Sequence, residues 1–183
     1  MGDPKKKHKR YTTPKRPYDY DTLAKELRLL GAYGLRNKRE LWRHKTELSR
    51  IRRMAREKLS MDPVERAEGE RVMTRKLHSI GIVGERATLE DILTLRIEGL
   101  MDRRLQTVVH RRGMAKSLFQ ARQLIAHGHI SIGGRKVRAP SYLVTLEDEA
   151  RLEYAGSSPL AVKEHPLRRE FAVSEMVGGE TDG

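Results

Sequence analysis

Nine Lys and Arg side chains between residues 103 and 146 are the clearest chemical signal in the sequence, because no Asp or Glu lies among them. A run of charge is often no more than a solvated face, but 44 residues without an acid are unusual in a chain with 25 acids. Arginine suits phosphate, because its planar guanidinium donates to two phosphate oxygens at once. We therefore expect contacts with phosphates or sugars from Arg103, Arg104, Arg111, Arg112, Lys116, Arg122, Arg135, Lys136 and Arg138.

A second basic group occupies the first third of the chain. Up to residue 60 there are 19 basic and 7 acidic side chains, a net charge of +12, whereas the remainder carries only +1. Residues 1–20 contain three prolines and no apolar periodicity, so they cannot fold alone. We predict an arm that orders on a phosphate backbone, with a plain disordered tail as the alternative. The candidate contacts in this third of the chain are Lys5, Lys6, Lys7, Arg10, Arg43, Arg50 and Arg53.

Composition narrows the partner class to polyanions. The 183 residues carry 38 Lys and Arg against 25 Asp and Glu, a net charge of +13, and they include no Cys. This balance favours nucleic acid, because basic groups release counter-ions when they meet a polyanion. The longest stretch without formal charge, residues 123–134, is too short to span a membrane. We predict a cytoplasmic protein that binds no membrane, no metal and no cofactor.

Catalytic motifs are missing from the sequence. It lacks the G-x-S-x-G nucleophile elbow, the phosphate-binding G-x-x-x-x-G-K-[ST] loop and the H-E-x-x-H zinc motif. Its acids gather in the C-terminal quarter and on helix faces, where solvated ion pairs are the ordinary explanation. We therefore predict that the chain is not an enzyme.

Residues 21–102 show helical periodicity and no strand signal of comparable strength. Asn37 and Glu40 have the spacing of a capping box, and Pro63 stands at the first helical position after an Asp N-cap. The longest of these helices should carry Arg43, Arg50 and Arg53 on its basic face. The expected helices run from Asp21 to Gly31, from Asn37 to Leu59, from Pro63 to Gly81, and onward from Thr88.

Two short helices are expected after residue 102. The first spans Arg103 to Arg112, so that Arg104 and Arg111, seven positions apart, should project nearly in line. Ser117 opens the second helix. Its side chain can act as an N-cap, and the free N–H groups of the same turn can also seat a phosphate. The cap alone is the simpler interpretation.

A small sheet is expected beside this helix pair. From Ile130 the apolar period changes from 3.6 to 2, and Gly133-Gly134 fits a two-residue hairpin turn. Further short strands are predicted over 142–146 and 152–154, with an acidic turn at 147–149 between them. The basic loops around this unit would then surround a concave platform that can follow an RNA backbone.

These patterns predict an α+β fold, mainly α, in which a basic helical domain precedes an α-α-β RNA-binding domain with a small antiparallel sheet. The predicted segments are an arm over 1–20, a helical domain over 21–102, an RNA-binding domain over 103–160, and a C-terminal segment over 161–183 that is disordered from about 177.

Several residues of the second half form one pattern: Arg104-Leu105, Gly113, Ser117, Ala121-Arg122-Gln123-Leu124-Ile125, Gly128-His129-Ile130, Gly134, Val137 and Pro140-Ser141-Tyr142. With them, the run 103–144 resembles the RNA-binding domain named after small-subunit ribosomal protein S-four. The run 98–105 and the basic N-terminal third resemble that ribosomal protein family itself. Gln106 stands where members often have Asp, and Gly133 where they often have Asn. Many bacterial members carry an N-terminal zinc-binding cysteine cluster, and its absence indicates the archaeal and eukaryotic branch.

The resemblance implies a primary binder of small-subunit rRNA. Such a protein docks at a multi-helix junction of the rRNA 5′ domain, aids early assembly and later lies near the path by which mRNA enters. Its implied partners are the rRNA, neighbouring small-subunit ribosomal proteins and, at that path, mRNA. Two residues join the candidate RNA contacts: Gln123, from the matching run, and His127, which could stack on a base or pack against the hairpin.

Two other functions stay open on the sequence. A ribosome-biogenesis paralogue that binds precursor rRNA or a guide RNA would share the same fold and length. An RNA-modifying enzyme, such as a pseudouridine synthase, can carry this domain as an appendage, but it needs a separate catalytic domain with an active-site sheet. The first of these has no physical signature that separates it from the ribosomal protein.

Overall fold

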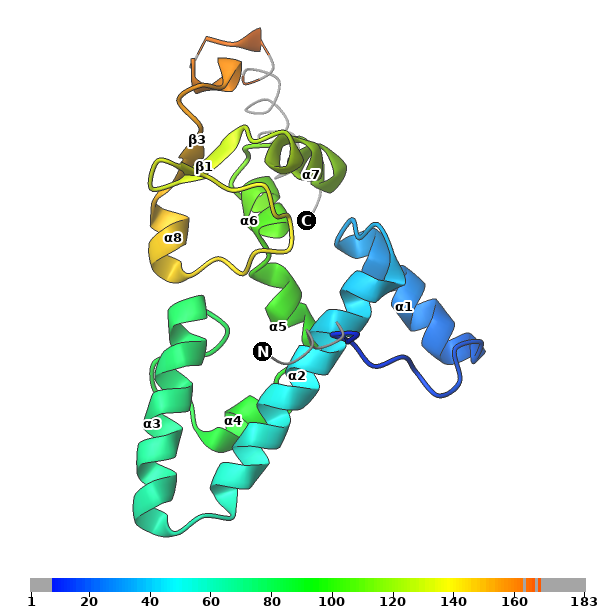
Figure 1. Cartoon of the computed structure of the whole chain (residues 1–183), viewed down its shortest axis with the longest axis vertical. Helices are drawn as coiled ribbons and strands as arrows, with labels where there is room; N and C mark the ends of the chain where they lie inside the picture. Colours follow the sequence, from blue (N-terminus) through cyan, green and yellow to red (C-terminus); the bar gives the residue numbers. More distant parts are fainter. Residues whose placement is uncertain (1–7, 163, 167, 169–183) are drawn as a thin grey trace, which may run out of the picture.

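The computed structural model describes residues 8–162, 164–166 and 168. Lys5, Lys6 and Lys7 of the predicted RNA contacts, and the tail predicted from about 177, lie outside the described residues. Within them the fold is mainly helical with one small sheet, which confirms the predicted fold class (Figure 1). The first five helices are α1 (Tyr20–Ala32), α2 (Lys38–Leu59), α3 (Pro63–Ile80), α4 (Leu89–Thr94) and α5 (Ile97–Asp102).

Helix α2 is the spine of the first half. Figure 1 shows α1 on one side of it and α3 with α4 on the other. The apolar stripe of α2 packs on the inner faces of its neighbours, so the helical period of the sequence decides which residues are buried. The resulting core contains Leu48, Ile51, Ala55, Met73, Leu77, Leu89, Ile92 and Leu100.

The predicted start of α2 is confirmed, because the Asn37 side chain accepts a hydrogen bond from the Glu40 backbone N–H at 3.2 Å. The predicted end of α1 is wrong. Its helix continues through Gly31 to Ala32, and the left-handed residue is Gly34, with φ 56°. The Leu35 N–H donates to the Leu30 oxygen and the Gly34 N–H to the Gly31 oxygen, which together form a Schellman ending.

The second half contains the predicted helix pair, α6 (Leu105–Arg111) and α7 (Leu118–Ala126), and a three-stranded antiparallel sheet. Strand β1 (Ile130–Ile132) lies between β2 (Arg135–Lys136) and β3 (Leu152–Tyr154). Gly133 and Gly134 both have positive φ, as a two-residue hairpin turn requires. The helices and the sheet share a core that includes Leu105, Val109, Ala121, Ile125, Ile130, Val144 and Leu152.

The segment between the hairpin and β3 differs from the prediction. Residues 142–145 form only an isolated bridge, between Leu143 and Arg104, and the expected acidic turn is instead helix α8 (Leu146–Ala150). The Thr145 side chain accepts from the Asp148 backbone N–H, so it caps this helix. The three acids then lie in its first turn, where the helix dipole favours negative charge. A short 3-10 turn, Pro159–Ala161, follows β3.

Candidate nucleic-acid interface

One exposed basic surface lies on α2. Arg43, Arg50 and Arg53 are all exposed on this helix, as its periodicity predicts. Arg53 pairs with Glu57 at 2.8 Å, and Arg50 lies 4.0 Å from Glu47. Exposed pairs of this kind contribute little free energy, so a phosphate can replace either carboxylate at small cost. The face of α2 can therefore present three guanidinium groups to a polyanion.

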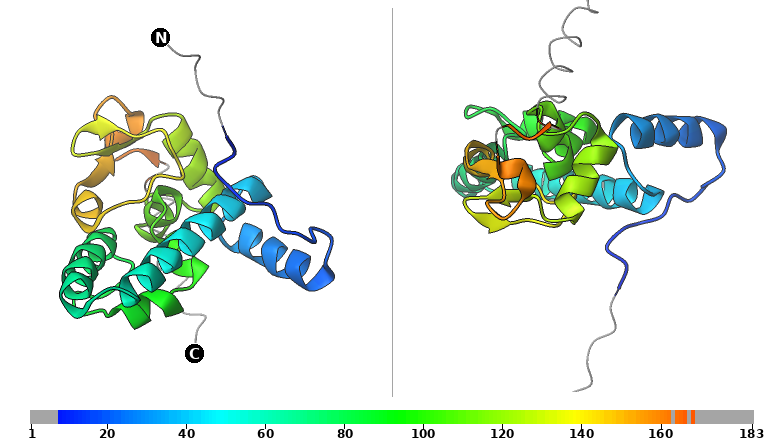
Figure 2. Two further views of the ribbon diagram at one scale, coloured as in Figure 1. Left: turned by 60° about the horizontal axis from the view of Figure 1, so that its bottom comes forward. Right: turned by 90° about the horizontal axis from the view of Figure 1, so that it is seen from above.

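The described part of the N-terminal arm is attached to the same helix. The Tyr11 ring lies 5.9 Å from the Trp42 ring, centroid to centroid, and the Thr12 N–H donates to Thr46 Oγ1 at 3.0 Å. Figure 2 shows this segment passing α2 before it reaches the far end of α1. The contacts hold Arg10, the residue before Tyr11, beside the basic face of α2.

A cavity of about 480 Å³ opens between α2 and the second half of the chain. Arg10 and Arg43 line it from the arm and from α2, and Arg122 lines it from α7. Pro140 and Leu143 close its other side. The cavity therefore brings together three cations from segments that are far apart in the sequence, beside the carboxylates of Glu40 and Glu47.

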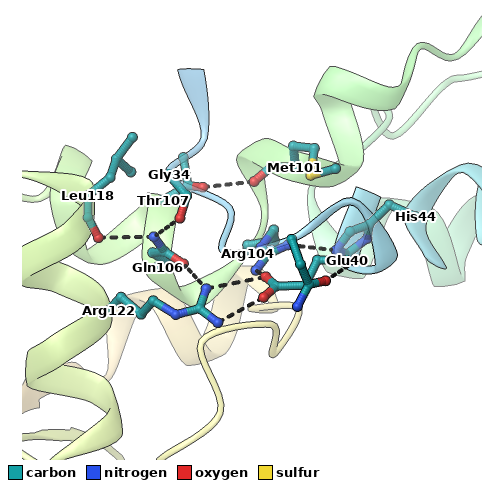
Figure 3. A network of polar contacts seen from close by, with 10 residues as sticks. Gly34, Glu40, His44, Met101, Arg104, Gln106, Thr107, Leu118 and Arg122 are labelled. Atoms are coloured by element: carbon teal, nitrogen blue, oxygen red, sulfur yellow. Dashed lines mark hydrogen bonds and ion pairs between the residues drawn. The ribbon is translucent and has the colours of Figure 1, made fainter. Parts of the chain in front are cut away.

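Arg104 does not lie on the surface. The sequence predicted that it projects in line with Arg111, but its side chain is 0% exposed, whereas Arg111 is exposed. Helix α6 begins two residues later than expected, so Arg104 is its N-cap residue and turns inward. Its Nη2 donates to Glu40 Oε2 at 2.7 Å and its Nη1 lies 3.1 Å from His44 Nε2 (Figure 3). In this structure the buried Arg104 guanidinium binds the partly buried carboxylate of Glu40.

Arg122 shares that carboxylate. Its Nη2 donates to Glu40 Oε1 at 2.8 Å, and its Nη1 lies 3.4 Å from Gln106 Oε1 (Figure 3). The Arg122 side chain remains 26% exposed, where it lines the cavity. Both Nη atoms of this guanidinium therefore bind protein, while part of the side chain stays in contact with solvent.

Burial and charge set the protonation of the network. Burial alone raises the pKa of the Glu40 carboxyl, but hydrogen bonds from Arg122 and Arg104 outweigh it and hold that pKa below its usual value. Burial, assisted by the charge of Arg104, lowers the pKa of His44 to about 4. His44 is therefore neutral at pH 7. Because arginine can only donate, His44 Nε2 must accept, which places the imidazole proton on Nδ1.

Three predicted contacts on the other side of α6 are paired with acids. Arg103 Nη1 lies 2.7 Å from Glu149, and its guanidinium also donates to the Val144 oxygen. Arg111 pairs with Asp102 at 2.6 Å. Arg112 lies 3.9 Å from Glu149 and stays partly exposed. The pairs of Arg111 and Arg112 are partly exposed, so RNA phosphates can exchange with their acids, whereas the Arg103 side chain is only 13% exposed.

A second exposed basic surface surrounds the hairpin. Lys116, Arg135, Lys136 and Arg138 are exposed, and none of them forms an ion pair within the part of the chain that the structure describes. Ser117 caps α7 by accepting from the Gln120 N–H at 3.2 Å. Gln123 and His127 are exposed farther along the same helix and at its end.

The structure thus separates the nine basic candidates of the second half into two sets. The hairpin and the α6–α7 loop present four cations that have no ion pair among the described residues, whereas Arg103, Arg104, Arg111, Arg112 and Arg122 lie within 4.0 Å of carboxylates. His127 is exposed, and its ring lies 6.4 Å from the His129 ring, centroid to centroid. The face of α2 and the arm supply the other exposed candidates, Arg10, Arg43, Arg50 and Arg53.

The chain is similar to known proteins over most of its length. The S4 domain family model matches residues 103–149, which contain α6, α7, the hairpin and most of α8. A curated relative, small ribosomal subunit protein uS4 of Hyperthermus butylicus, is 45% identical over 176 residues, which cover 95% of this chain and all of that protein. Small ribosomal subunit protein uS4 of Methanospirillum hungatei is 46% identical over 177 residues, which cover 94% of this chain and 98% of that protein.

The chain belongs to the small ribosomal subunit protein uS4 family. Membership confirms the predicted resemblance, including its archaeal branch. Because uS4 is a ribosomal protein, the family also confirms that the chain is not an enzyme, and it removes the RNA-modifying alternative. Among the described residues, no helix is long and apolar enough to cross a bilayer.

Sequence reasoning missed the buried centre of this uS4-family chain. Glu40 was assigned to a capping box with Asn37, but its carboxylate binds Arg104 and Arg122 instead. Gln106 was noted only as a departure from the family pattern. A signal for Glu40 was present, since it is the only acid between Lys38 and Lys45 in a strongly basic segment. Nothing local indicated its partners, which lie 64 and 82 residues away.

Proposed function

We propose that this uS4-family chain is a primary rRNA-binding protein of the small ribosomal subunit. It docks on a multi-helix junction of the rRNA 5′ domain, nucleates assembly there, and later lies beside neighbouring small-subunit proteins near the path by which mRNA enters. The observation that carries the proposal is the pair of exposed basic surfaces on one folded body, one on α2 and one around the hairpin. Family membership supports the same function.

The contacts would be made mainly with the RNA backbone. Side chains cannot read the deep, narrow major groove of A-form RNA, so shape and phosphates dominate its recognition. The free cations Lys116, Arg135, Lys136 and Arg138 suit this role, as do the weakly paired Arg50 and Arg53. Only 5% of the residues are aromatic, which disfavours a platform that stacks single-stranded bases.

A junction fits the geometry better than one isolated helix does. The two basic surfaces belong to different halves of the chain, and the cavity lined by Arg10, Arg43 and Arg122 lies between them. A junction can offer backbone to both surfaces at once, whereas a single straight duplex offers one continuous face. Ser117 remains a candidate phosphate contact, because the free N–H groups at the start of α7 point outward beside its cap.

Binding of the intact chain to a 5′-domain rRNA fragment across a salt series tests the proposal. We expect log affinity to fall linearly with log salt, by roughly 0.7 to 0.9 per neutralised phosphate. A plain duplex of equal length is the control, and it should bind more weakly at every salt concentration. Salt-insensitive binding, or equal binding to the plain duplex, contradicts the proposal.

Sedimentation of cell extracts separates the ribosomal protein from the biogenesis alternative. A structural component stays with mature small subunits, whereas an assembly factor is found with precursor particles and leaves before maturity. We expect this chain to sediment with the mature subunits. Its confinement to precursor particles would show a biogenesis paralogue instead.

A further inference from the structure

We infer that Glu40 is a positioning residue for RNA binding: it holds the basic face of α2 and the basic hairpin in one fixed relation. The inference rests on the proposed function and names a residue that positions the same RNA-binding interface. Glu40 lies in the first turn of α2, the helix that carries Arg43, Arg50 and Arg53. Its two oxygens bind Arg104 and Arg122, which belong to the half of the chain that carries the hairpin.

The two oxygens of Glu40 bind two elements, and Oε2 accepts from both of them, because Arg122 Nη1 also donates to it at 3.3 Å. Oε2 accepts from Arg104, the N-cap residue of α6, at 2.7 Å, and Oε1 accepts from Arg122 of α7 at 2.8 Å. The carboxylate therefore fixes the direction of both helices relative to α2 (Figure 3). Because α7 leads directly through Gly128 into β1, the hairpin takes its orientation from the same contact.

Both packing and polar contacts join the two halves. Their main buried clusters are separate, and the halves touch where α3 meets α8. Beside Glu40, the two halves are joined by Gln106, whose side-chain nitrogen donates to the Gly34 oxygen at 3.0 Å. Directional polar contacts can select one orientation where non-directional apolar contact allows several.

The network is not arranged for stability alone. Burying charged groups costs solvation free energy, which is recovered only when every polar atom finds a partner. Nε of Arg104 is buried without a hydrogen-bond partner. An apolar set of similar volume would avoid that cost, so the observed charges are better explained by the orientation that they impose.

The consequence for binding is a preorganised surface. A ligand that touches both halves must otherwise hold their relative orientation at the expense of its own binding free energy. With Glu40 in place, the cations of α2 and of the hairpin are already set for the RNA. Loss of Glu40 should therefore weaken binding, although it removes an acid from a surface that binds a polyanion.

Glu47 provides a matched control, because the loss of this acid should not weaken RNA binding. It is also an acid of α2, but among the described residues its only ion pair is the 4.0 Å contact with Arg50 in the same helix. Both Glu40→Gln and Glu47→Gln remove one negative charge, which alone favours RNA binding. We expect Glu40→Gln to weaken binding to the 5′-domain fragment about tenfold. We expect Glu47→Gln to bind as tightly as the unmodified chain or more tightly.

Orientation can be measured without RNA. The chain has no Cys, so spin labels at Met54→Cys in α2 and Glu153→Cys in β3 report one distance between the halves. The distance distribution should broaden in Glu40→Gln and stay narrow in Glu47→Gln. If Glu40→Gln does not fold, as shown by circular dichroism, Gln106→Ala carries the same test, because it loosens the join without changing charge. That variant should both broaden the distance distribution and lower the affinity for the rRNA fragment.

The outcomes separate this inference from the proposed function. A narrow distance in Glu40→Gln, or affinity equal to that of Glu47→Gln, overturns the positioning role while rRNA binding stands. Failure of the unmodified chain to bind the rRNA fragment overturns the proposed function, even if the distance measurement shows a fixed orientation. A broadened distance together with weakened binding supports both.

Discussion

The side-chain amide of Gln106 donates to the backbone oxygen of Gly34 at 3.0 Å, although the two residues are 72 positions apart. The same nitrogen also donates to the Leu118 oxygen at 2.9 Å, so one amide joins three segments of the chain (Figure 3). An ionised Asp, common at this position in the family, has no proton to donate to either carbonyl. The departure from the family pattern therefore has a structural reason in this chain.

Gln106→Glu should lower the free energy of unfolding by at least about 2 kcal/mol, because a buried carboxylate would replace a donor that faces two carbonyl oxygens. Urea unfolding at pH 7 measures the difference. Gln123→Glu is the control, since it makes the same change at an exposed position of α7 and should alter stability little. Equal effects of the two substitutions would contradict the bridging role of Gln106.

His44 should make the folded chain sensitive to mild acid. Its pKa is lowered from 6.5 to about 4 by burial and by the charge of Arg104, so between these values the unfolded chain binds more protons. Stability is fully present above pH 6.5 and falls by about 3 kcal/mol as the pH decreases to 4. Urea unfolding at several pH values measures this loss.

His44→Gln keeps an acceptor for Arg104 but cannot titrate. Its stability should therefore decline less between pH 6.5 and 4 than that of the unmodified chain. Glu40, whose pKa is also lowered, loses its stabilising effect only as the pH falls below about 4.5, and it does so in both chains. His127→Gln, at an exposed position, should retain the full decline. Identical pH profiles for the unmodified chain and His44→Gln would refute the assignment.

Replacing Gly34 and Gly31 by alanine should change the stability of the chain in opposite directions. Gly34 has φ 56°, and a Cβ there would lie 2.8 Å from Leu118 Cβ, so Gly34→Ala should cost more than about 1 kcal/mol. Gly31 lies within α1 with nothing near its Cβ position, so Gly31→Ala should stabilise the chain by about 0.5–1 kcal/mol. Thermal unfolding of both variants measures the two changes in stability. Changes of the same sign would mean that α1 ends at another residue.

The hairpin surface should account for part of the salt dependence of RNA binding. Replacing Arg135, Lys136 and Arg138 together by Gln should lower the slope of log affinity against log salt by about two. The matched control replaces Arg71, Arg75 and Lys76 by Gln, which removes three exposed charges from α3, outside both basic surfaces. If the two triple variants have equal slopes, the hairpin is not a preferred RNA contact.

Local signals predicted most of the fold. Asn37, Thr88 and Ser117 each accept a hydrogen bond from the backbone three residues later, as the cap spacing indicates. Gly113, Gly128 and the Gly133-Gly134 pair all adopt the positive φ that the helix ends and the hairpin require. These elements depend on neighbours in the sequence, so the sequence contains the information directly.

Two errors came from incomplete use of such local signals. Thr145 and Asp148 have the same cap spacing as the helices that were predicted, yet the three acids beside them were interpreted as a turn. Gly31 was taken as a helix end because it follows the last apolar residue of the stripe. The ending instead depends on Leu35, whose backbone returns to Leu30 beyond a second glycine.

The candidate site was harder to predict, because it depends on contacts between distant residues. Spacing along α6 indicates that Arg104 and Arg111 share a direction, but Arg104 lies at the helix boundary, where its side chain reaches Glu40. The type of residue identifies a cation and does not say whether its partner is a phosphate or a buried acid. Only the packing of α2 against α6 and α7 decides that question.

The contact between Tyr11 and Trp42 gives this protein a fluorescent reporter of its own. Trp42 is the only tryptophan in the chain, so its emission arises from the place where the arm meets α2. Its indole N–H also donates to the buried Glu26 carboxylate at 3.1 Å, which fixes the ring in one setting. If RNA releases or captures the arm, the surroundings of the Trp42 ring change. The change in Trp42 fluorescence can then be measured on the unlabelled protein.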